Sequence, residues 1–277
     1  MTKATMSWED AVRWCLNRPE MADLARDAYF GDPVDAARRY RDSAEFAEIR
    51  RMLPAAKGRA LDLGAGNGIL SWALAADGWE VTAVEPDASD LVGAGAIRAL
   101  AAQTGQPIAV IEAFGEAIPL EAAGFDLVVA RQVLHHARDL PAFCAEMHRL
   151  SRPGATILTL RDHVISGPAQ LQPFLDSHPL HHLYGGENAF TLAEYRAALT
   201  AARLQVLREM RSFQSVVNFD PMSRDGVLDR LAAMAGPARP LLRAALGAVP
   251  FAVIAAGAAA ADRRPGRLVS FLCRRED

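Results

Sequence analysis

The sequence has few cysteines, few aromatic residues and almost no excess of charge of either sign. Its 277 residues include Cys15, Cys144 and Cys273, an odd and widely spaced set that argues against a disulfide framework. Thirty basic against 33 acidic residues leave a net charge of −3, which argues against nucleic-acid binding. The opening residues, MTKATMSWED, lack the apolar core of a secretory signal. We therefore expect a cytoplasmic protein that does not act on DNA or RNA.

A long apolar run near the C-terminus raises the question of a membrane span. Residues 244–261, AALGAVPFAVIAAGAAAA, carry no charge, but Ala and Gly dominate them and Pro250 would break a helix. We expect small-residue helices packed on the core or on a second subunit, so a homodimer is possible. Because 51% of the residues are apolar, the chain can bury a full core, which favours one elaborated α/β domain.

The most informative segment is ALDLGAGNGIL, residues 60–70. An apolar stretch interrupted only by Asp62 predicts a buried strand, and Gly64, Gly66 and Gly68 then predict a turn into a helix ending near Asp77. Glycine permits positive φ and lets a ligand approach the main-chain N–H groups closely. The segment therefore predicts a nucleotide-type binding loop.

An acidic residue follows the loop at the spacing expected for a ribose ligand. Glu85, in VTAVEPD, lies 21 positions after Gly64 and ends the next predicted strand. A nicotinamide or flavin dinucleotide is the alternative, but its fingerprint requires a small third residue where this chain has Ile69. The GxGxG spacing, with an acid two residues before the first glycine, resembles motif I of class I S-adenosylmethionine (SAM) dependent methyltransferases.

The resemblance, closest to the type 11 group, extends over residues 58–162. Residues 125–160 resemble the second half of the family's core, and GEAIPL, residues 115–120, is similar to the segment below the adenine ring. One departure is Phe114, where many relatives carry an acid, so main-chain groups, Glu112 or Glu116 are the candidates to hold the adenine. The resemblance implies a set of cofactor-binding residues: Asp62, Gly64, Ala65, Gly66, Gly68, Glu85, Pro86, Gly115, Glu116 and Arg131.

Alternating apolar and helical segments predict a Rossmann-like doubly wound α/β sheet. The resemblance implies seven strands in the order 3-2-1-4-5-7-6, the last antiparallel. We expect a helical cap over residues 1–56 and a SAM-binding domain over 57–277, with insertions at about 163–190, a candidate lid, and 215–264. Strands are expected near 59–64, 80–85, 108–113, 125–131 and 155–162, with a further pair in LQVLREMRSF and RLVSFLCRR.

Histidines cluster after the predicted strands and supply candidate catalytic residues. A neutral imidazole can accept a proton from a hydroxyl or ammonium group. His163 is the best candidate, because the end of its strand commonly faces the acceptor in the family; His135 and His136 serve either as a base or in capping and packing. In a regular strand, Arg161 and His163 point to one side and Asp162 to the other.

The unusual segment SHPLHHLYGGENAF, residues 177–190, holds further polar side chains. Its histidines and Glu187 are metal-ligand types, but the segment lacks cysteine and an HExxH pattern, so we predict no metal. A lining of the acceptor site or simple packing are the alternatives. The candidate substrate-binding residues are Tyr29, Arg161, His178, His181, His182 and Tyr184.

Two functions of different class fit these patterns. One is SAM-dependent transfer of a methyl group to oxygen or nitrogen of a small-molecule acceptor, such as a natural product, a sugar or another metabolite, with S-adenosylhomocysteine as product. The other is a SAM-binding protein that regulates or catalyses a non-methylating reaction, because a fold does not fix its chemistry. Turnover to S-adenosylhomocysteine distinguishes them.

Overall fold

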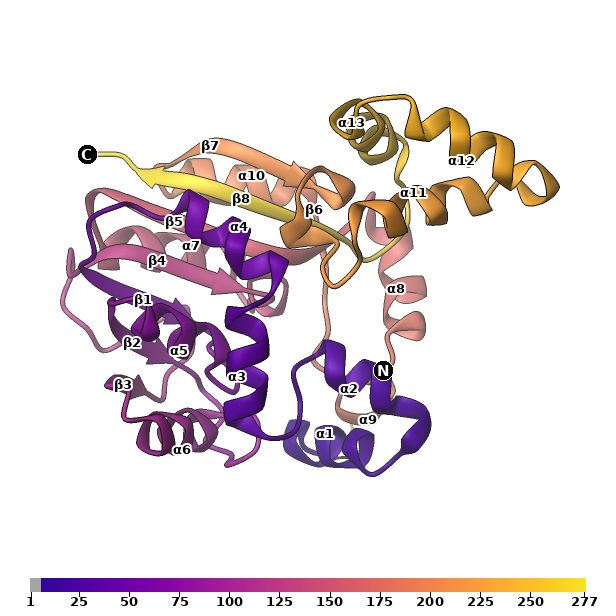
Figure 1. The fold of residues 1–277 in the computed structure, drawn as a ribbon. Coiled ribbons are helices and arrows are strands. Elements are labelled where there is room, and N and C mark those ends of the chain that lie inside the picture. The colour runs from indigo at the N-terminus through magenta and orange to yellow at the C-terminus, as the bar shows by residue number, and fades with distance from the viewer. Residues whose placement is uncertain (1–5) are drawn as a thin grey trace.

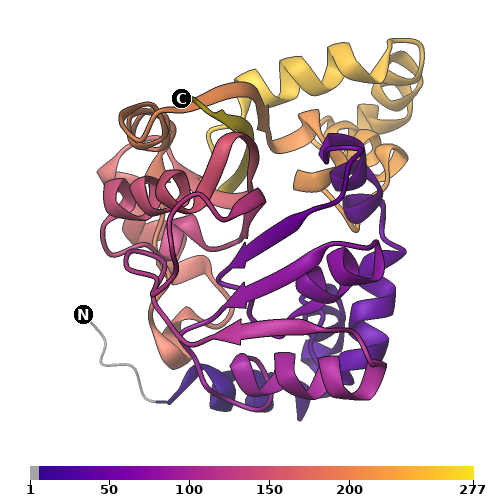
Figure 2. The ribbon, with the colours of Figure 1, turned by 90° about the vertical axis from the view of Figure 1, so that its left-hand side faces the viewer.

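A single mixed sheet forms the centre of the molecule, and helices cover both of its faces (Figures 1 and 2). The computed structural model describes residues 6–277. The strands are β1 (Arg59–Leu63), β2 (Glu80–Val84), β3 (Ile108–Ile111), β4 (Phe125–Arg131), β5 (Ser151–Ile165), β6 (Phe190–Thr191), β7 (Leu204–Arg211) and β8 (Arg267–Arg275).

The helices follow the strands in the alternation that a doubly wound fold requires. They are α1 (Trp8–Leu16), α2 (Ala22–Asp27), α3 (Pro33–Arg41), α4 (Ala44–Met52), α5 (Ile69–Ala76), α6 (Ala94–Thr104), α7 (Leu140–Leu150), α8 (Leu171–Ser177), α9 (His181–Tyr184), α10 (Leu192–Ala201), α11 (Arg224–Ala233), α12 (Arg239–Gly247) and α13 (Phe251–Ala261). Short 3-10 turns include η2 (Leu134–His136) and η5 (Val216–Asn218).

The sheet order is β3-β2-β1-β4-β5-β8-β7, with the short β6 beside β5. Strands β1 to β5 pair in parallel, and β8 pairs antiparallel with both β5 and β7. Since β8 and β7 occupy the places of the seventh and sixth strands, the predicted order and its antiparallel strand are confirmed. The addition is β6, which the sequence analysis did not predict.

Alternating side chains of the central strands fill two cores, one on each face. Leu61 of β1 and Val128 of β4 pack with α7 and α10, whereas Ala60 and Val129 pack with α3, α4 and α5. Parallel strands buried on both faces read as continuous apolar runs, which is why the sequence showed them clearly. The carboxyl ends of β1, β2, β4 and β5 consequently meet at one edge, where ligands bind in this architecture.

Strand β5 is not regular near its carboxyl end. Its register with β8 shifts between Thr159 and Asp162, and Arg161 has a φ of +59°. The alternation expected for a regular strand therefore fails here. Asp162 and His163 both approach His135 of η2, whereas Arg161 points toward α4 and η5.

The N-terminal helices and the segment after β5 pack against each other. Residues of α1 and α2, including Ala11 and Cys15, share an apolar cluster with Leu180 and Leu183. Ser7 caps α1 by accepting a hydrogen bond from the Asp10 N–H. The cap and the candidate lid thus form one unit beside the carboxyl edge of the sheet, while the domain boundary at residue 56 stays a prediction.

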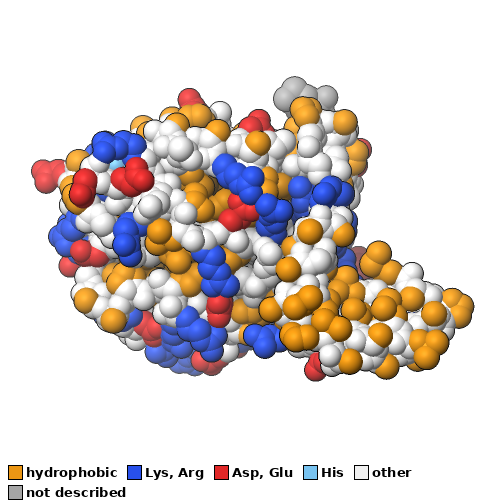
Figure 3. Space-filling view, turned by 90° about the horizontal axis from the view of Figure 1, so that it is seen from above, with side chains coloured by type: hydrophobic (Ala, Val, Ile, Leu, Met, Phe, Trp, Pro, Cys, Tyr) orange, Lys and Arg blue, Asp and Glu red, His pale blue; other side chains and the backbone are white. Residues whose placement is uncertain are grey.

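Helices α11, α12 and α13 form a projecting lobe in which hydrophobic side chains predominate (Figure 3). Pro250 separates α12 from α13, as expected, and within residues 6–277 no helix meets the length and hydropathy needed to cross a membrane. Helix α13 buries Ala255 and Ala259 only, and α12 buries none of its residues, so the structure shows little of the expected packing on the core. Leu241 is 78% exposed. The predicted homodimer stays a prediction.

Candidate functional site

The glycine-rich loop between β1 and α5 adopts the conformation that its sequence predicts. Gly64, Gly66 and Gly68 have φ values of +62°, +56° and +82°, which side-chain-bearing residues rarely adopt. A Cβ on Gly64 would lie 2.2 Å from a methyl carbon of Val133, whereas the place of a Cβ on Gly66 has no non-neighbouring atom within 4 Å. The first glycine therefore permits close packing, and the second borders open space.

Glu85 organises this loop from the end of β2. Its Oε2 accepts a hydrogen bond of 2.8 Å from the Gly66 N–H, and its Oε1 accepts one of 3.0 Å from the Asp87 N–H. Burial raises the pKa of the Glu85 carboxyl, and the two main-chain donors oppose that shift. The acid required by the sequence pattern thus lies directly against the glycine loop, and a carboxylate oxygen can accept further donors.

Asp62 lies beneath the loop and is almost fully buried. Its Oδ2 accepts a hydrogen bond of 2.6 Å from the Ser71 hydroxyl of α5. Desolvation raises the pKa of Asp62 to about 7. The carboxyl therefore joins the end of β1 to the following helix.

The segment predicted to lie below an adenine ring runs past the start of α7. Glu116 Oε1 accepts a hydrogen bond of 2.8 Å from the Arg138 N–H, and Gly115 packs so closely on Phe143 that a Cβ would lie 2.0 Å from its ring. Phe114 is half exposed beneath the Arg138 guanidinium. Glu112 pairs with Arg98, and Pro86 is exposed beside Glu85.

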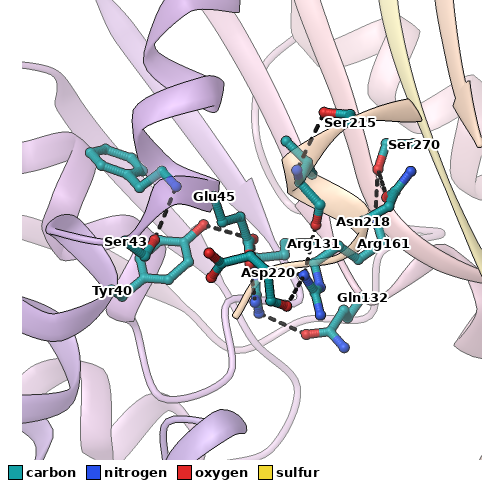
Figure 4. Close-up of polar contacts among 12 residues, drawn as sticks. Tyr40, Ser43, Glu45, Arg131, Gln132, Arg161, Ser215, Asn218, Asp220 and Ser270 are labelled. Carbon is teal, nitrogen blue, oxygen red and sulfur yellow. Dashed lines mark hydrogen bonds and ion pairs between the residues drawn. The ribbon is translucent and has the colours of Figure 1, made fainter. Parts of the chain in front are cut away.

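A buried ion-pair network lies where β4 and β5 end (Figure 4). Glu45 of α4 is 1% exposed and receives two hydrogen bonds from Arg131, of 2.5 and 3.0 Å, and one of 3.3 Å from Arg161. These cations hold the pKa of Glu45 below its usual range despite its burial. Arg161 also donates to the carbonyl oxygens of Val217 and Asp220.

The network forms one wall of a cavity of about 270 Å³ between the cap and the sheet edge. Tyr29 belongs to its lining, has a φ of +59°, and stacks edge-on against Tyr40. The Tyr29 carbonyl accepts a hydrogen bond of 2.9 Å from the Asn67 side chain of the glycine loop. The cavity therefore lies between the cap and Arg161, and Tyr29 joins its lining to the glycine loop.

A second polar cluster gathers the histidines. His135 Nδ1 and Asp162 Oδ1 share a hydrogen bond of 3.0 Å, and the His135 N–H donates to the same oxygen at 3.2 Å. Burial raises the pKa of Asp162 to about 8 and, together with the neighbouring imidazoles, lowers that of His135. His135 is therefore neutral, with its ring orientation set by Asp162.

His163 and Glu187 approach the same point from two other segments. His163 Nδ1 bonds to the Gly266 carbonyl oxygen at 2.9 Å, so Nδ1 carries the proton and Nε2 is a free acceptor. One ligand atom each from His135, His163 and Glu187 lie within 4.8 Å of one another. His178 Nε2 lies 3.6 Å from Glu187 Oε1.

His136 lies beside the histidine cluster, with its ring centroid 4.1 Å from that of His135. Its Nδ1 bonds to the Gly186 carbonyl oxygen at 2.9 Å, which leaves Nε2 as a free acceptor on an exposed side chain. A charge on His136 would lower the pKa values of both Glu85 and His163, so its imidazole is close to both groups.

The remaining candidates lie in or beside α9. Tyr184 donates a hydrogen bond to Glu187 and stacks on Trp8 of α1 with ring centroids 4.5 Å apart. His181 is half-buried and His182 is exposed. The structure therefore brings together His135, His136, His163, His178 and Tyr184 around Glu187, and leaves His182 at the surface.

Sequence reasoning missed the parts played by Glu45 and Asp162. Glu45 lies in a cap helix without a motif, and its contacts with Arg131 span 86 positions. The available signal was an acid among the apolar positions of α4, which Phe46 and Ile49 define. Asp162 was assigned to the side opposite His163, and only the irregularity of β5 brings both to His135.

The part of the chain that contains the glycine loop and the central parallel strands is similar in sequence to known proteins. Residues 61–159 match the family model described as a methyltransferase domain. An uncharacterized methyltransferase of Mycobacterium tuberculosis is 37% identical over 131 residues, which are 46% of this chain and 49% of the relative. A ubiquinone biosynthesis O-methyltransferase of Methylobacterium nodulans is 35% identical over 105 residues, 38% of this chain and 41% of the relative.

Solved structures extend the similarity of the fold to most of the chain. Geranyl diphosphate C-methyltransferase from Streptomyces coelicolor, solved with S-adenosyl-L-homocysteine, aligns with a TM-score of 0.58 at 15% identity. The alignment covers 95% of this chain and 87% of that one. By sequence, however, the chain spans about half the length of the curated relatives it matches.

Proposed function

We propose that this chain is a class I SAM-dependent methyltransferase and that it transfers a methyl group from SAM to oxygen or nitrogen of a small-molecule acceptor. The observation that carries the proposal is the glycine loop held by Glu85 directly beside a histidine cluster at one sheet edge. An O-methyltransferase among the relatives supports such an acceptor.

The residues of the loop fit the cofactor. Gly66 borders open space, so a ligand can approach its main chain, and Glu85 keeps lone pairs for ribose hydroxyls. Asp62 and Ala65 hold the loop through Ser71 and the Val84 carbonyl. Bound SAM supplies an electrophilic methyl group, so the protein has to position the acceptor and manage one proton.

His136 is our first choice for the proton acceptor. Its Nε2 is free, its side chain reaches solvent, and it lies between Glu85 and the histidine cluster. His163 and His135 remain candidates from the sequence, but both are more buried than His136 and lie beside Glu187. A base that can return its proton to water fits repeated turnover better than a buried one.

The acceptor site that we propose extends from the histidine cluster toward the cavity of about 270 Å³ beside Arg161 and Tyr29. His178, His181, His182 and Tyr184 belong to the segment that covers the cluster from the cap side. Arginine and tyrosine side chains suit a polar or acidic acceptor. The cytoplasmic location stays a prediction.

The test uses purified protein, methyl-deuterated SAM and a fractionated metabolite extract, with mass spectrometry of labelled products and S-adenosylhomocysteine. We expect a labelled small molecule in proportion to S-adenosylhomocysteine. Glu85→Ala should weaken SAM binding, and His136→Gln should lower turnover with SAM binding intact. His148→Gln on α7 is the control. Tight SAM binding without label transfer in any acceptor pool would favour the non-methylating alternative.

A further inference from the structure

A convergent set of nitrogen and carboxylate donors lies where the candidate lid meets the sheet. Donor atoms of His135, His163 and Glu187 lie within 4.8 Å of one another, although the residues come from η2, from β5 and from the segment before β6. His135 is 2% exposed in its side chain and Glu187 is 6% exposed. Burial of three such groups around one point is costly unless they share a proton network or a cation.

Both imidazoles are held in the orientation that metal ligands require. His135 forms a hydrogen bond through Nδ1 to Asp162, and His163 forms one through Nδ1 to the Gly266 carbonyl oxygen. In each ring, Nε2 is therefore available as a metal ligand. Metal-binding histidines almost always make this second hydrogen bond to a carboxylate or a main-chain carbonyl, which fixes the tautomer. The arrangement is therefore more specific than the proximity of two histidines.

The carboxylate supplies the third donor. Glu187 Oε1 accepts the hydrogen bond from Tyr184, whereas the buried Oε2 has no hydrogen-bond partner among residues 6–277 and lies 3.7 Å from His135 Nε2. Two donors on a tetrahedral zinc ion lie about 3.3 Å apart, so the His135–Glu187 pair needs little contraction, whereas a pair at the 4.8 Å limit of the set needs about 1.5 Å. The uncommitted oxygen faces the position where an ion would lie.

We propose that His135, His163 and Glu187 bind a divalent transition-metal ion, most suitably Zn²⁺. Two imidazoles and one carboxylate form a donor set used for zinc, whereas Mg²⁺ and Ca²⁺ prefer oxygen ligands. His178, with Nε2 3.6 Å from Glu187 Oε1, is the side chain placed to supply a fourth donor. Residues 177–190 alone predict no metal, because two of the three ligands lie outside them.

The ion would fasten the candidate lid to the sheet edge. Glu187 belongs to the lid, its neighbour Tyr184 stacks on Trp8 of the cap, and both histidines belong to segments at the carboxyl ends of β4 and β5. Binding energy at this point opposes opening of residues 178–190, because opening would separate Glu187 from the two rings. This inference does not depend on methyl transfer, since its tests measure bound metal and lid protection.

The first test measures Zn²⁺ binding to the untagged chain by competition with a chromophoric chelator. We expect one equivalent to bind, with Mg²⁺ unable to compete. Glu187→Gln and His163→Gln should each weaken Zn²⁺ binding at least 100-fold, and His148→Gln should bind like the wild type. Asp162→Asn should weaken it by about 10- to 100-fold, as loss of an orienting partner does.

A second test needs no variant and therefore does not depend on the folding of one. Limited proteolysis of the wild-type chain should cut residues 178–190 more slowly with Zn²⁺ than with a chelator, and Mg²⁺ should give no protection. Wild-type protein that loses Zn²⁺ to a weak chelator would overturn the proposal, as would equal binding by folded Glu187→Gln protein. Failure of Zn²⁺ to bind a protein that still transfers methyl groups would reject this site and leave the proposed function intact.

Discussion

Alanine at Gly64 and alanine at Gly66 separate the packing of the glycine loop from its binding role. Both positions have positive φ, which costs a side-chain-bearing residue roughly 1–2 kcal/mol. At Gly64 the new Cβ would lie 2.2 Å from Val133, and relieving that overlap costs roughly another 1–3 kcal/mol. We therefore expect Gly64→Ala to lower the free energy of unfolding by about 2–5 kcal/mol.

Gly66→Ala should lower the free energy of unfolding less than Gly64→Ala does, but should lower SAM affinity. Its Cβ would meet no non-neighbouring atom within 4 Å, so only the backbone cost of roughly 1–2 kcal/mol remains. The same Cβ would enter the open space where we place the cofactor. SAM affinity should then fall by about tenfold or more, because 1.4 kcal/mol of lost contact is a factor of ten.

The assay is chemical denaturation of both variants without ligand, followed by calorimetric titration with SAM. We expect the two variants to rank differently in the two measurements. Gly64→Ala should have the lower free energy of unfolding, and Gly66→Ala should lose more SAM affinity. If folded Gly66→Ala bound SAM like the wild type, the open space beside Gly66 would not be the cofactor site. If the two variants were equally stable, the contact with Val133 would not limit the loop.

Three further predictions concern the surroundings of the site. Glu45→Gln leaves Arg131 and Arg161 without their buried anion, so it should lower the free energy of unfolding by about 3–5 kcal/mol in chemical denaturation. Glu48→Gln on the same helix removes a more exposed ion pair and should lower it by less than about 1 kcal/mol. Equal losses in the two variants would contradict the network. The pKa of Asp62 is raised to about 7, so its contribution to stability is present below its unfolded pKa and is lost as pH rises through about 7. Asp62→Asn should therefore gain stability relative to the wild type between about pH 4 and about pH 7 and no further above that, and a pH-independent difference would reject the shift. Trp8→Ala removes the stacking on Tyr184 and should speed proteolysis of residues 178–190 with little change in global unfolding, and an unchanged cleavage rate would mean that α1 does not hold the lid.

Local patterns explain why the strands and the glycine loop could be predicted. The run from Ala60 to Leu70 contains its own strand, turn and helix signals, and the positive φ values of its glycines follow from that turn. The strand of Glu85 is equally apolar, and the parallel sheet then requires its carboxyl end to lie beside the loop. The contacts within a βαβ unit join residues that are close in sequence, so their spacing can be recognised from the sequence alone.

The polar contacts at the carboxyl ends of β4 and β5 could not be predicted in the same way, because they join residues that are distant in sequence and depend on one irregular strand. His135 meets Asp162 across 27 positions, and Arg161 meets Glu45 across 116. Nothing in RDHVIS shows that the register of β5 shifts before Asp162, so alternation assigned its neighbours to the wrong sides.

The sequence by itself determined the sheet, the glycine loop and the acid that holds it, since each arises from neighbouring residues with a clear backbone preference. Only the tertiary structure decided which polar side chains meet. The bulge in β5 turns Arg161 toward Glu45 and leaves Asp162 and His163 at His135, and the packing of α1 on α9 brings Glu187 to the same point. Burial makes these contacts important for stability, because a polar group removed from water needs a hydrogen-bonding partner.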